Sequence, residues 1–486
     1  MSEKNNMSYV PYTLSDVYDA VEKAKNDGTS FTVFSTFAGG GGSSTGYKLA
    51  GGDVRGIVEF QKVGVRGYLT NYPNTKFFCK DIRDITGEQV LKRLRMKPRE
   101  LDIFDASPPC PPFSMSGSKR KGWNKTKTVY GFKQTNIEDL SFDVARLVGV
   151  VQPKVFICEN VKGMTMEYAH DHFQSIMHTF AEQGYEVGWR VFNAKNFGVP
   201  QGRERVFIVG VRGDVWETVT GKDLSITFGR INLFEEEKLS TGEDKLPGIW
   251  PEPSESIPTL KDSIYELMPY YDSKGNKDNI AEHNEMMEIT KKQARWKYFS
   301  QMPVHKLDEN GDTMPDSEFF TSKSYAEYAD FYRLEKIKEW EEMPPDLRYL
   351  MPKDCWINRK TGERRDEESL DKDIEENRGD WKNVGYARKK GFQVRRVSWN
   401  HVSHTLTERG LQVGTGAHIH PQEKRGFTSI EAKRIMSLPD DYYLDGNLNQ
   451  RLARVGLMVA PRQMESIARK INESILQPYK EKLKNA

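Results

Sequence analysis

The sequence contains few cysteines and no long hydrophobic run, and these absences exclude several classes of protein. Four of its 486 residues are cysteine, and no two of them form a Cys-x-x-Cys pair, so neither a disulfide framework nor a zinc ribbon is expected. No apolar stretch approaches membrane-spanning length, and the first residues lack the apolar core of a signal peptide. We therefore expect a cytoplasmic protein with no membrane segment.

The chain also lacks a strong net charge. Its formal charge is +2 at pH 7, and so small an excess says little about partners. The basic residues are nevertheless concentrated in places, because the ranges 116–135 and 388–396 are rich in lysine and arginine and contain no acid. Either run could neutralise the phosphates of a nucleic acid, and a solvated basic loop is the alternative for each.

Strand-like and helix-like stretches alternate over the first two hundred residues, which predicts an α/β fold with a largely parallel sheet. The expected strands are Phe31–Thr36, Val54–Glu59, Leu101–Ala106, Lys154–Glu159, Glu186–Asn193 and Arg205–Val211. The expected helices are Tyr12–Asn26, Lys62–Asn71, Glu138–Val151, His170–Gln183 and Pro461–Leu476.

The composition changes after residue 213. The range 214–396 is polar, rich in Glu, Lys, Trp, Tyr and Pro, and weakly periodic, which indicates a separate, irregular domain. We expect four segments: a helical extension over 1–30, the α/β domain over 31–213, the irregular domain over 214–396, and a segment over 397–486 that returns to the α/β domain.

A glycine cluster, Gly39–Gly42, follows the first expected strand and opens a short helix. Glycines there allow a ligand to approach the backbone, and the amides at a helix start favour an anionic group. Glu59 ends the second strand, where a carboxylate can bind ribose hydroxyls, and Phe60 could stack on a purine. Asp81 and Ile82 repeat this pattern at a third strand end. Three interpretations remain open: a nucleotide site, a site for an adenosyl cofactor, and a plain tight turn with exposed acids.

A cysteine stands among four prolines directly after another strand, in Pro108-Pro109-Cys110-Pro111-Pro112. Prolines fix the backbone around it, and a rigidly placed thiol is what a nucleophile requires. A buried structural cysteine is the usual alternative, but so many prolines in a loop bordered by serine and glycine argue against it.

Two more polar motifs follow later strands. Glu159 comes after a strand whose end lies at the same sheet edge if the strands are parallel, and a carboxyl of raised pKa could donate a proton to a ring nitrogen. Arg203 and Arg205 are one residue apart, so on a strand they share a face. They could hold a carboxylate or a base carbonyl, and a surface salt-bridge cluster is the alternative.

The order of these motifs resembles that of the DNA cytosine-5 methyltransferase family. The similarity covers residues 31–211 and 397–470. It rests on the glycine turn, Pro-Pro-Cys, Glu-Asn-Val, Gln-x-Arg-x-Arg and, near the C-terminus, Arg425-Gly-Phe-Thr with Glu431 and Arg434. It implies a Rossmann-like S-adenosylmethionine-dependent methyltransferase fold, with the catalytic and cofactor-binding domain at 31–213 and a separate, irregular target-recognition domain at 214–396.

The resemblance also implies a reaction. A methyl group would pass from S-adenosylmethionine to carbon 5 of a flipped-out cytosine in a specific duplex DNA sequence. Cys110 would attack C6 and form a covalent intermediate, and Glu159 would contact N3. Arg205 would hold O2 of the base, with Arg203 beside it.

Binding residues follow from the same resemblance. The expected cofactor-binding residues are Phe37, Gly39, Gly41, Glu59, Phe60, Asp81, Ile82, Pro109 and Leu140. The expected DNA-binding residues are Ser114, Lys119, Arg120, Lys121 and Arg425, since the basic loop Lys119–Lys133 resembles the mobile catalytic loop of the family. The implied partners are double-stranded DNA and a cognate restriction endonuclease that acts separately, and the chain is expected to be a monomer.

Two features depart from the family or lie outside it. Leu457 and Met458 replace the Asn and Ser that help the family bind its cofactor. Either the cofactor contacts differ there or another methyl donor is used, and the intact remaining cofactor motifs favour the first. His401, His404, His418 and His420 fall within twenty residues, but no Cys or acid joins them at ligand spacing, and no metal site is expected.

Three rival functions are weighed against this one. An RNA cytosine-5 methyltransferase has the same fold, but the large inserted domain favours duplex DNA. A non-catalytic DNA-binding relative would not need Cys110, Glu159, Arg203 and Arg205 together. A nicotinamide dehydrogenase built on the glycine turn leaves the Pro-Pro-Cys motif unexplained.

Overall fold

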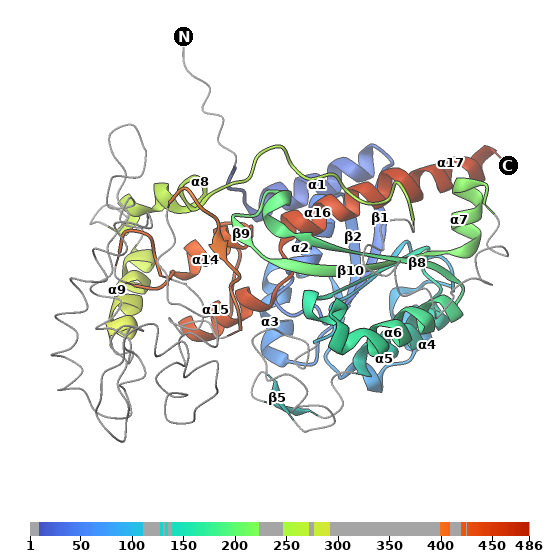
Figure 1. Ribbon diagram of the computed structural model, residues 1–486, viewed down its shortest axis with the longest axis horizontal. Coiled ribbons are helices and arrows are strands. Elements are labelled where there is room, and N and C mark those ends of the chain that lie inside the picture. The colour runs from blue at the N-terminus through green and yellow to red at the C-terminus, as the bar shows by residue number, and fades with distance from the viewer. Residues whose placement is uncertain are drawn as a thin grey trace, which may run out of the picture. The chain divides into compact units, whose positions relative to one another are not determined.

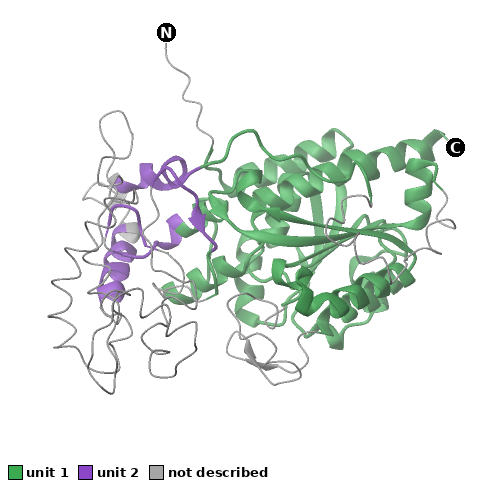
Figure 2. Ribbon diagram, in the orientation of Figure 1, with its two compact units in different colours: residues 1–258, 406–410, 432–486 green, residues 259–405, 411–431 purple. Residues whose placement is uncertain are grey.

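The computed structural model describes residues 9–109, 127–129, 132–134, 139–222, 246–271, 277–291, 399–408, 419–423 and 425–485. The chain divides into two compact units (Figure 2). Unit 1 comprises residues 1–258, 406–410 and 432–486, and unit 2 comprises residues 259–405 and 411–431.

Unit 1 is built on a seven-stranded sheet of order β3-β2-β1-β4-β7-β10-β8. Its strands are β1 (Phe31–Thr36), β2 (Gly52–Val58), β3 (Lys76–Phe78), β4 (Ile103–Ala106), β7 (Val155–Val161), β8 (Tyr185–Asn193) and β10 (Glu204–Arg212). The first five pair in parallel, and β10 runs antiparallel to both β7 and β8. The predicted α/β fold with a largely parallel sheet is confirmed.

Helices cover both faces of this sheet, with α4, α5 and α6 on one face and α1, α2 and α16 on the other (Figure 1). The strands of a parallel sheet covered on both sides are mostly apolar, and β4 is buried at every position, including Asp105. The helices of unit 1 are α1 (Leu14–Asn26), α2 (Gly42–Leu49), α3 (Lys62–Asn71), α4 (Gly87–Leu94), α5 (Leu140–Val151), α6 (His170–Glu182), α7 (Gly213–Thr220), α15 (Leu448–Leu457), α16 (Pro461–Ile471) and α17 (Gln477–Asn485).

Phenylalanines from neighbouring strands form the centre of the core under α4, α5 and α6. The rings of Phe34 on β1 and Phe104 on β4 meet edge to face at 5.5 Å, and Phe156 on β7 stacks on Phe180 of α6 at 4.1 Å. Each such pair adds about 1 kcal/mol of stabilisation beyond that from the area it buries. The core therefore fixes the order of the central strands, whose ends carry the motifs.

Of unit 2 the structure describes residues 259–271, 277–291, 399–405, 419–423 and 425–431. The elements described in it are α8 (Leu260–Ile264), α9 (Lys277–Lys291) and β11 (Ser403–His404), and α14 (Ser429–Ile435) begins in it and ends in unit 1. Trp399 is fully buried, and its carbonyl accepts a hydrogen bond from the amide of Lys261 at 2.9 Å.

The bounds of the two units differ from those of the expected segments. Residues 1–30 belong to unit 1, and unit 1 continues past residue 213, where α7 packs against β8 and β10. Residues 406–410 and 432–486 return to unit 1, whereas 411–431 belong to unit 2, so the Arg425-Gly-Phe-Thr motif lies in unit 2. Short pieces outside the main sheet are β9 (Gln201–Gly202) and the antiparallel pair β5 (Lys127–Val129) and β6 (Phe132–Gln134). Among the described residues, no helix is long and apolar enough to span a bilayer.

Helices α2 and α16 of unit 1 pack closely against each other. A Cβ atom placed on Gly46 of α2 would lie 2.5 Å from the carbonyl oxygen of Pro461 and 2.6 Å from Cβ of Met464. Glycine is needed here for close approach, because any side chain would overlap the backbone of α16.

We expect Gly46→Ala to destabilise the protein by roughly 1–3 kcal/mol, since the overlap forces the two helices apart. Gly67→Ala in α3 is the matched control, because a Cβ there would meet only Asp445, at 3.5 Å. The control should be neutral or stabilising by up to about 1 kcal/mol, as alanine favours helix. Urea unfolding of the two variants measures the difference, and equal effects would contradict this assignment.

Candidate active site

The glycine cluster forms a tight turn between β1 and α2. Gly39 and Gly41 have φ angles of 52° and 90°, and the amide of Gly41 donates to the carbonyl of Ala38 at 2.8 Å. This left-handed conformation is open to glycine and strained for other residues. Phe37 also has a positive φ, 56°, without being glycine, and such outliers gather at functional sites.

Glu59 follows β2 and is bound to this turn. One carboxylate oxygen accepts the amide of Gly39 and the other accepts the amide of Gln61, both at 2.8 Å. Burial raises the pKa of Glu59, and these hydrogen bonds oppose the shift. Each oxygen keeps lone pairs for a further donor. The structure thus brings together Glu59 and Gly39, two of the expected cofactor-binding residues.

Asp81 has a partner that the sequence reasoning missed. Its carboxylate accepts the Nε and Nη2 groups of Arg83 at 2.9 Å and 2.7 Å, and also the backbone amide of Arg83. Burial raises the pKa of Asp81, but these hydrogen bonds outweigh burial and lower it. Ile82 beside it is buried in the core, and so is Leu140 at the start of α5. Phe60 is half-buried after β2.

The Pro-Pro segment is attached to its neighbours on both sides. The side-chain amide of Asn160 donates to the carbonyl of Pro108 at 3.2 Å, and the hydroxyl of Ser107 donates to the carbonyl of Phe37 at 3.4 Å. Pro109 is half-buried, and Cys110 lies outside the described residues. The expectation that this segment and Glu159 share a sheet edge is confirmed, because β4 and β7 are parallel neighbours.

Glu159 and Arg205 form an ion pair at that edge. β10 runs antiparallel to β7, which places Arg205 opposite Val161, and Nε of Arg205 lies 2.9 Å from a carboxylate oxygen of Glu159. Both side chains are largely buried. Burial lowers the pKa of Arg205, and Glu159 opposes the shift. Low exposure strengthens such a pair electrostatically.

Arg203 does not join this pair, contrary to the prediction that the two arginines share a face. The guanidinium of Arg203 is 2% exposed and donates to the carbonyls of Leu406 and Gly456 at 3.2 Å and 3.0 Å. Strand alternation does not apply to it, because β10 begins only at Glu204. Arg203 instead binds two backbone segments from the C-terminal part of unit 1.

The altered last motif packs against the glycine turn. A Cβ placed on Gly42 would lie 2.8 Å from Cβ of Met458, and one placed on Gly40 would lie 3.0 Å from Cγ of Arg454. Met458 is buried. Met458, which departs from the family, thus supports the turn by apolar packing.

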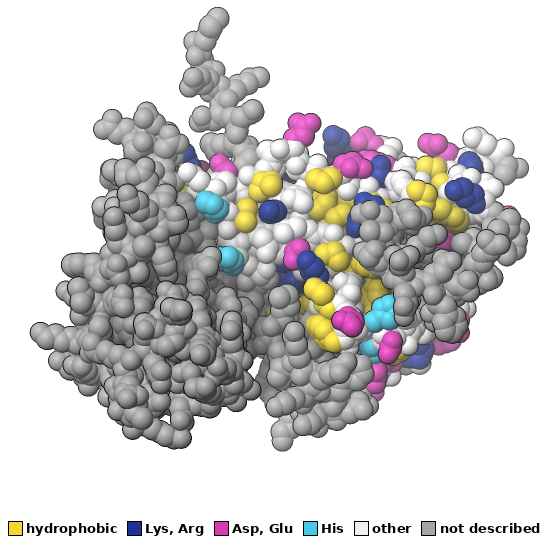
Figure 3. Space-filling model, in the orientation of Figure 1, with side chains coloured by type: hydrophobic (Ala, Val, Ile, Leu, Met, Phe, Trp, Pro, Cys, Tyr) yellow, Lys and Arg dark blue, Asp and Glu magenta, His cyan; other side chains and the backbone are white. Residues whose placement is uncertain are grey.

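The predicted DNA contacts are mostly beyond what the structure describes. Ser114, Lys119, Arg120 and Lys121 lie outside the described residues, and of the basic loop the structure describes only β5 and β6. On the face drawn in Figure 3, acidic and basic side chains are interspersed over the coloured residues of unit 1. That part of the surface therefore offers DNA no broad area of one charge.

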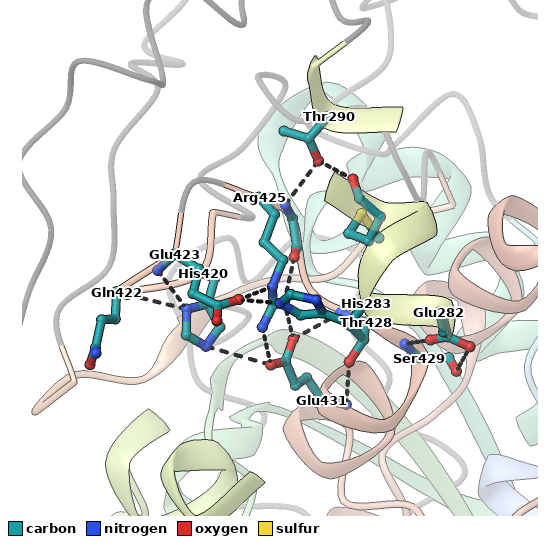
Figure 4. Close-up of polar contacts among 12 residues, drawn as sticks. Glu282, His283, Thr290, His420, Gln422, Glu423, Arg425, Thr428, Ser429 and Glu431 are labelled. Carbon is teal, nitrogen blue, oxygen red and sulfur yellow. Dashed lines mark hydrogen bonds and ion pairs between the residues drawn. The ribbon is translucent and has the colours of Figure 1, made fainter. Parts of the chain in front are cut away.

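Arg425, predicted to contact DNA, is instead buried in unit 2 (Figure 4). Its side chain is 0% exposed and donates to both carboxylate oxygens of Glu431, at 2.7 Å and 2.8 Å. It also contacts Glu423, which accepts from His283 of α9 at 2.8 Å. A guanidinium enclosed in this way has no surface to offer a phosphate, so the structure corrects this prediction.

His420 belongs to the same buried cluster. Its Nδ1 accepts the amide of Glu423 at 3.0 Å, and its Nε2 lies 3.5 Å from Glu431. His418 lies outside the described residues. In the described part of the chain, no three His, Cys, Asp or Glu side chains are grouped to hold a metal ion.

Comparison with known proteins gives the family. The model of the C-5 cytosine-specific DNA methylases matches residues 31–473. The chain belongs to this family. The match spans the glycine turn, the Glu159–Arg205 pair and the segment around Met458, so these residues lie within one family domain.

Individual relatives have low sequence identity to this chain. Type II methyltransferase M.XorII of Xanthomonas oryzae is 30% identical over 36% of this chain and 39% of its own length. Type II methyltransferase M.NlaIV of Neisseria lactamica is 26% identical over 76% of this chain and 83% of its own length. The chain spans less than half the length of the first relatives that it matches.

A solved structure shares the fold. It is described as a DNA modification methyltransferase encoded within an E. coli prophage, and it is 18% identical with a TM-score of 0.50. The match covers 92% of this chain and 99% of that one. At this identity the likeness concerns the fold alone, and it agrees with the Rossmann-like methyltransferase architecture that the sequence predicts.

The buried cluster of unit 2 makes its stability dependent on pH. Burial alone would raise the pKa of Glu431, but Arg425 and His420 lower it to about 2, and His283 and Arg425 lower that of Glu423 to about 2 in the same way. A carboxyl whose pKa is lowered by folding stabilises the fold above its unfolded pKa, near 4.5.

We therefore expect this stabilisation to be complete at neutral pH and to be lost as the pH falls from about 4.5 to about 2. Hydrogen exchange measured by mass spectrometry over 277–291 and 419–431 should show protection falling across that window. Protection that stays constant through it would contradict the assignment.

We expect Glu431→Gln to destabilise unit 2 by about 3 kcal/mol, because it leaves the charge of Arg425 buried beside a neutral partner. Glu288→Gln on α9 is the control, since it removes an exposed pair with Lys291 that contributes at most about 0.5 kcal/mol. Hydrogen exchange of the same peptides measures the effect of each substitution. Equal protection in the two variants would disprove the importance of the Arg425–Glu431 pair.

Proposed function

We propose that the protein transfers a methyl group from S-adenosylmethionine to carbon 5 of a flipped-out cytosine in a specific duplex DNA sequence. Membership of the C-5 cytosine-specific DNA methylase family supports this reaction class. The observation that carries the proposal is the Glu159–Arg205 pair, held at the sheet edge where the Pro-Pro segment leads to Cys110.

The glycine turn and Glu59 are suited to hold the methyl donor. A Cβ on Gly39 would meet only the carbonyl oxygen of Phe37, at 3.8 Å, so that side of the turn is open to a ligand. Glu59 presents lone pairs for ribose hydroxyls next to it. Half-buried Phe60, which follows the same strand, would stack on the adenine, and Pro109 and Leu140 would line the methionine side. S-adenosylmethionine would supply the electrophilic methyl group.

The residues of the chain would act on the cytosine in sequence. The Cys110 thiolate would add to C6, and the electron pair of the C5–C6 double bond would take the methyl group that S-adenosylmethionine supplies, whose bond to sulfur would break so that the donor leaves as S-adenosylhomocysteine. During this step Glu159 would stabilise the ring at N3, and Arg205 would both orient Glu159 and hold O2 of the base. Water would then take the C5 proton, and the electron pair of that C–H bond would restore the C5–C6 double bond and expel the Cys110 sulfur as a thiolate. Arg203 would act indirectly, by fixing the backbone beneath this pair.

Further parts of the proposal concern partners. Unit 2 would read the target sequence, and Ser114, Lys119, Arg120 and Lys121 would contact the DNA backbone. Relatives are named type II methyltransferases, which supports a cognate restriction endonuclease that acts separately. We propose a monomer that works in the cytoplasm.

Expression in a host that lacks cytosine methylation tests the proposal. Bisulfite sequencing of the host DNA should find protected cytosines at one sequence motif. Cys110→Ser should abolish the protection, and Glu159→Gln should slow methylation of purified duplex DNA by about 100-fold, because general acid and charge stabilisation at N3 are lost.

Glu182→Gln is the control for Glu159→Gln, because Glu182 is an exposed carboxylate at the end of α6 whose partner is His178. It should retain full activity. Methylation of RNA but not DNA would overturn the choice of substrate, and a fully active Cys110→Ser would overturn the mechanism.

A further inference from the structure

A carboxylate that the proposed reaction does not use is buried beside the site. Asp105 lies near the end of β4 and is 1% exposed. Its Oδ2 accepts the hydroxyls of Ser35 and Ser43 at 2.6 Å and 2.7 Å, and its Oδ1 accepts the hydroxyl of Tyr47 at 3.1 Å. All three donors are neutral, so the charge is held by hydrogen bonds alone.

The donors stand on both sides of the glycine turn. Ser35 is at the end of β1, just before the turn, and it pairs directly with Asp105 in the sheet register. Ser43 is in the first turn of α2, just after the glycines, and Tyr47 is one helical turn further along the same face. A single carboxylate therefore fixes both ends of the turn.

Asp105 also fixes the segment that leads to the cysteine. Its carbonyl accepts the hydroxyl of Thr36 at 3.1 Å, and two residues later Ser107 donates to the carbonyl of Phe37. Pro108 is then held by Asn160. The turn and the Pro-Pro segment thus share one anchor.

Burial of the Asp105 carboxylate disfavours its charged form. Burial raises the pKa of Asp105 to about 6, even though the three hydroxyl hydrogen bonds lower it and only partly offset burial. An apolar residue of similar size would avoid this penalty, and buried groups held against such a penalty are concentrated at functional sites.

We propose that Asp105 is a positioning residue that couples the glycine turn to the Pro-Pro segment, so that a ligand bound at the turn alters the reactivity of Cys110. This inference rests on the proposed function, because it takes the turn as the donor site and Cys110 as the nucleophile.

The test uses S-adenosylhomocysteine, which occupies the donor site without reacting. Isothermal titration calorimetry gives its dissociation constant, and mass spectrometry of the Cys110 peptide gives the rate of alkylation by iodoacetamide with and without the ligand. In the native protein the ligand should change that rate. Asp105→Asn should weaken ligand binding about tenfold and abolish its effect on Cys110, since an amide cannot accept all three hydroxyls.

Asp102→Asn is the matched control. Asp102 is also buried beside β1, where it accepts from the amide and hydroxyl of Thr32 and pairs with Lys154 at 2.7 Å, but it lies at the opposite end of β4. The Asp102→Asn variant should be less stable, while its ligand binding and the ligand effect on Cys110 should be unchanged. Exchange of the paired residues, Ser35→Asp with Asp105→Ser, keeps a carboxylate between β1 and β4 and should restore the ligand effect.

If Asp105→Asn does not fold, Tyr47→Phe removes one of the three donors and should give a smaller loss of the same kind. The inference is overturned if the native protein shows no ligand effect on Cys110, if a folded Asp105→Asn retains it, or if Asp102→Asn loses it equally. Failure of the native protein to bind S-adenosylhomocysteine at all would overturn the proposed function instead.

Discussion

Parallel pairing of β4 with β1 on one side and β7 on the other is the constraint on which the rest of the structure depends. It brings the carboxyl ends of three strands to one edge, so the glycine turn, the Pro-Pro segment and Glu159 become neighbours although they are far apart in sequence. β10 adds Arg205 only because it runs antiparallel and begins where β7 ends. Reversal of any of these strands would separate the groups.

Features of the fold that depend on local sequence pattern could be predicted from the sequence. The bounds of β1 and α3 fall where hydrophobic periodicity places them, and the parallel order follows from alternation of strands and helices. Arg203 was misjudged because strand alternation was extended one residue beyond the start of β10. Arg425 was misjudged because its partner Glu431 was noted only as part of a motif, and burial in an irregular unit leaves no periodic signal.

Long-range polar contacts explain the rest of what the sequence could not reveal. The three donors to Asp105 are 58 to 70 residues away from it, and no spacing rule links such positions. Buried charges recur in both units, yet they are compensated differently. Neutral hydroxyls surround Asp105, so burial raises its pKa, whereas Arg425 and His420 stand beside Glu431 and lower the pKa of that carboxyl.

The contact between α2 and α16 has a consequence for the newly made chain. Gly42 and Gly46 present a bare helix face that residues from Met458 onward cover, and those residues are synthesised after the whole of unit 2. At a synthesis rate of 5–20 residues per second, that face stays uncovered on the ribosome for on the order of tens of seconds. The sheet can pair early, but the helix layer on that face closes only near the end of translation, which makes this face a natural site for a chaperone to bind.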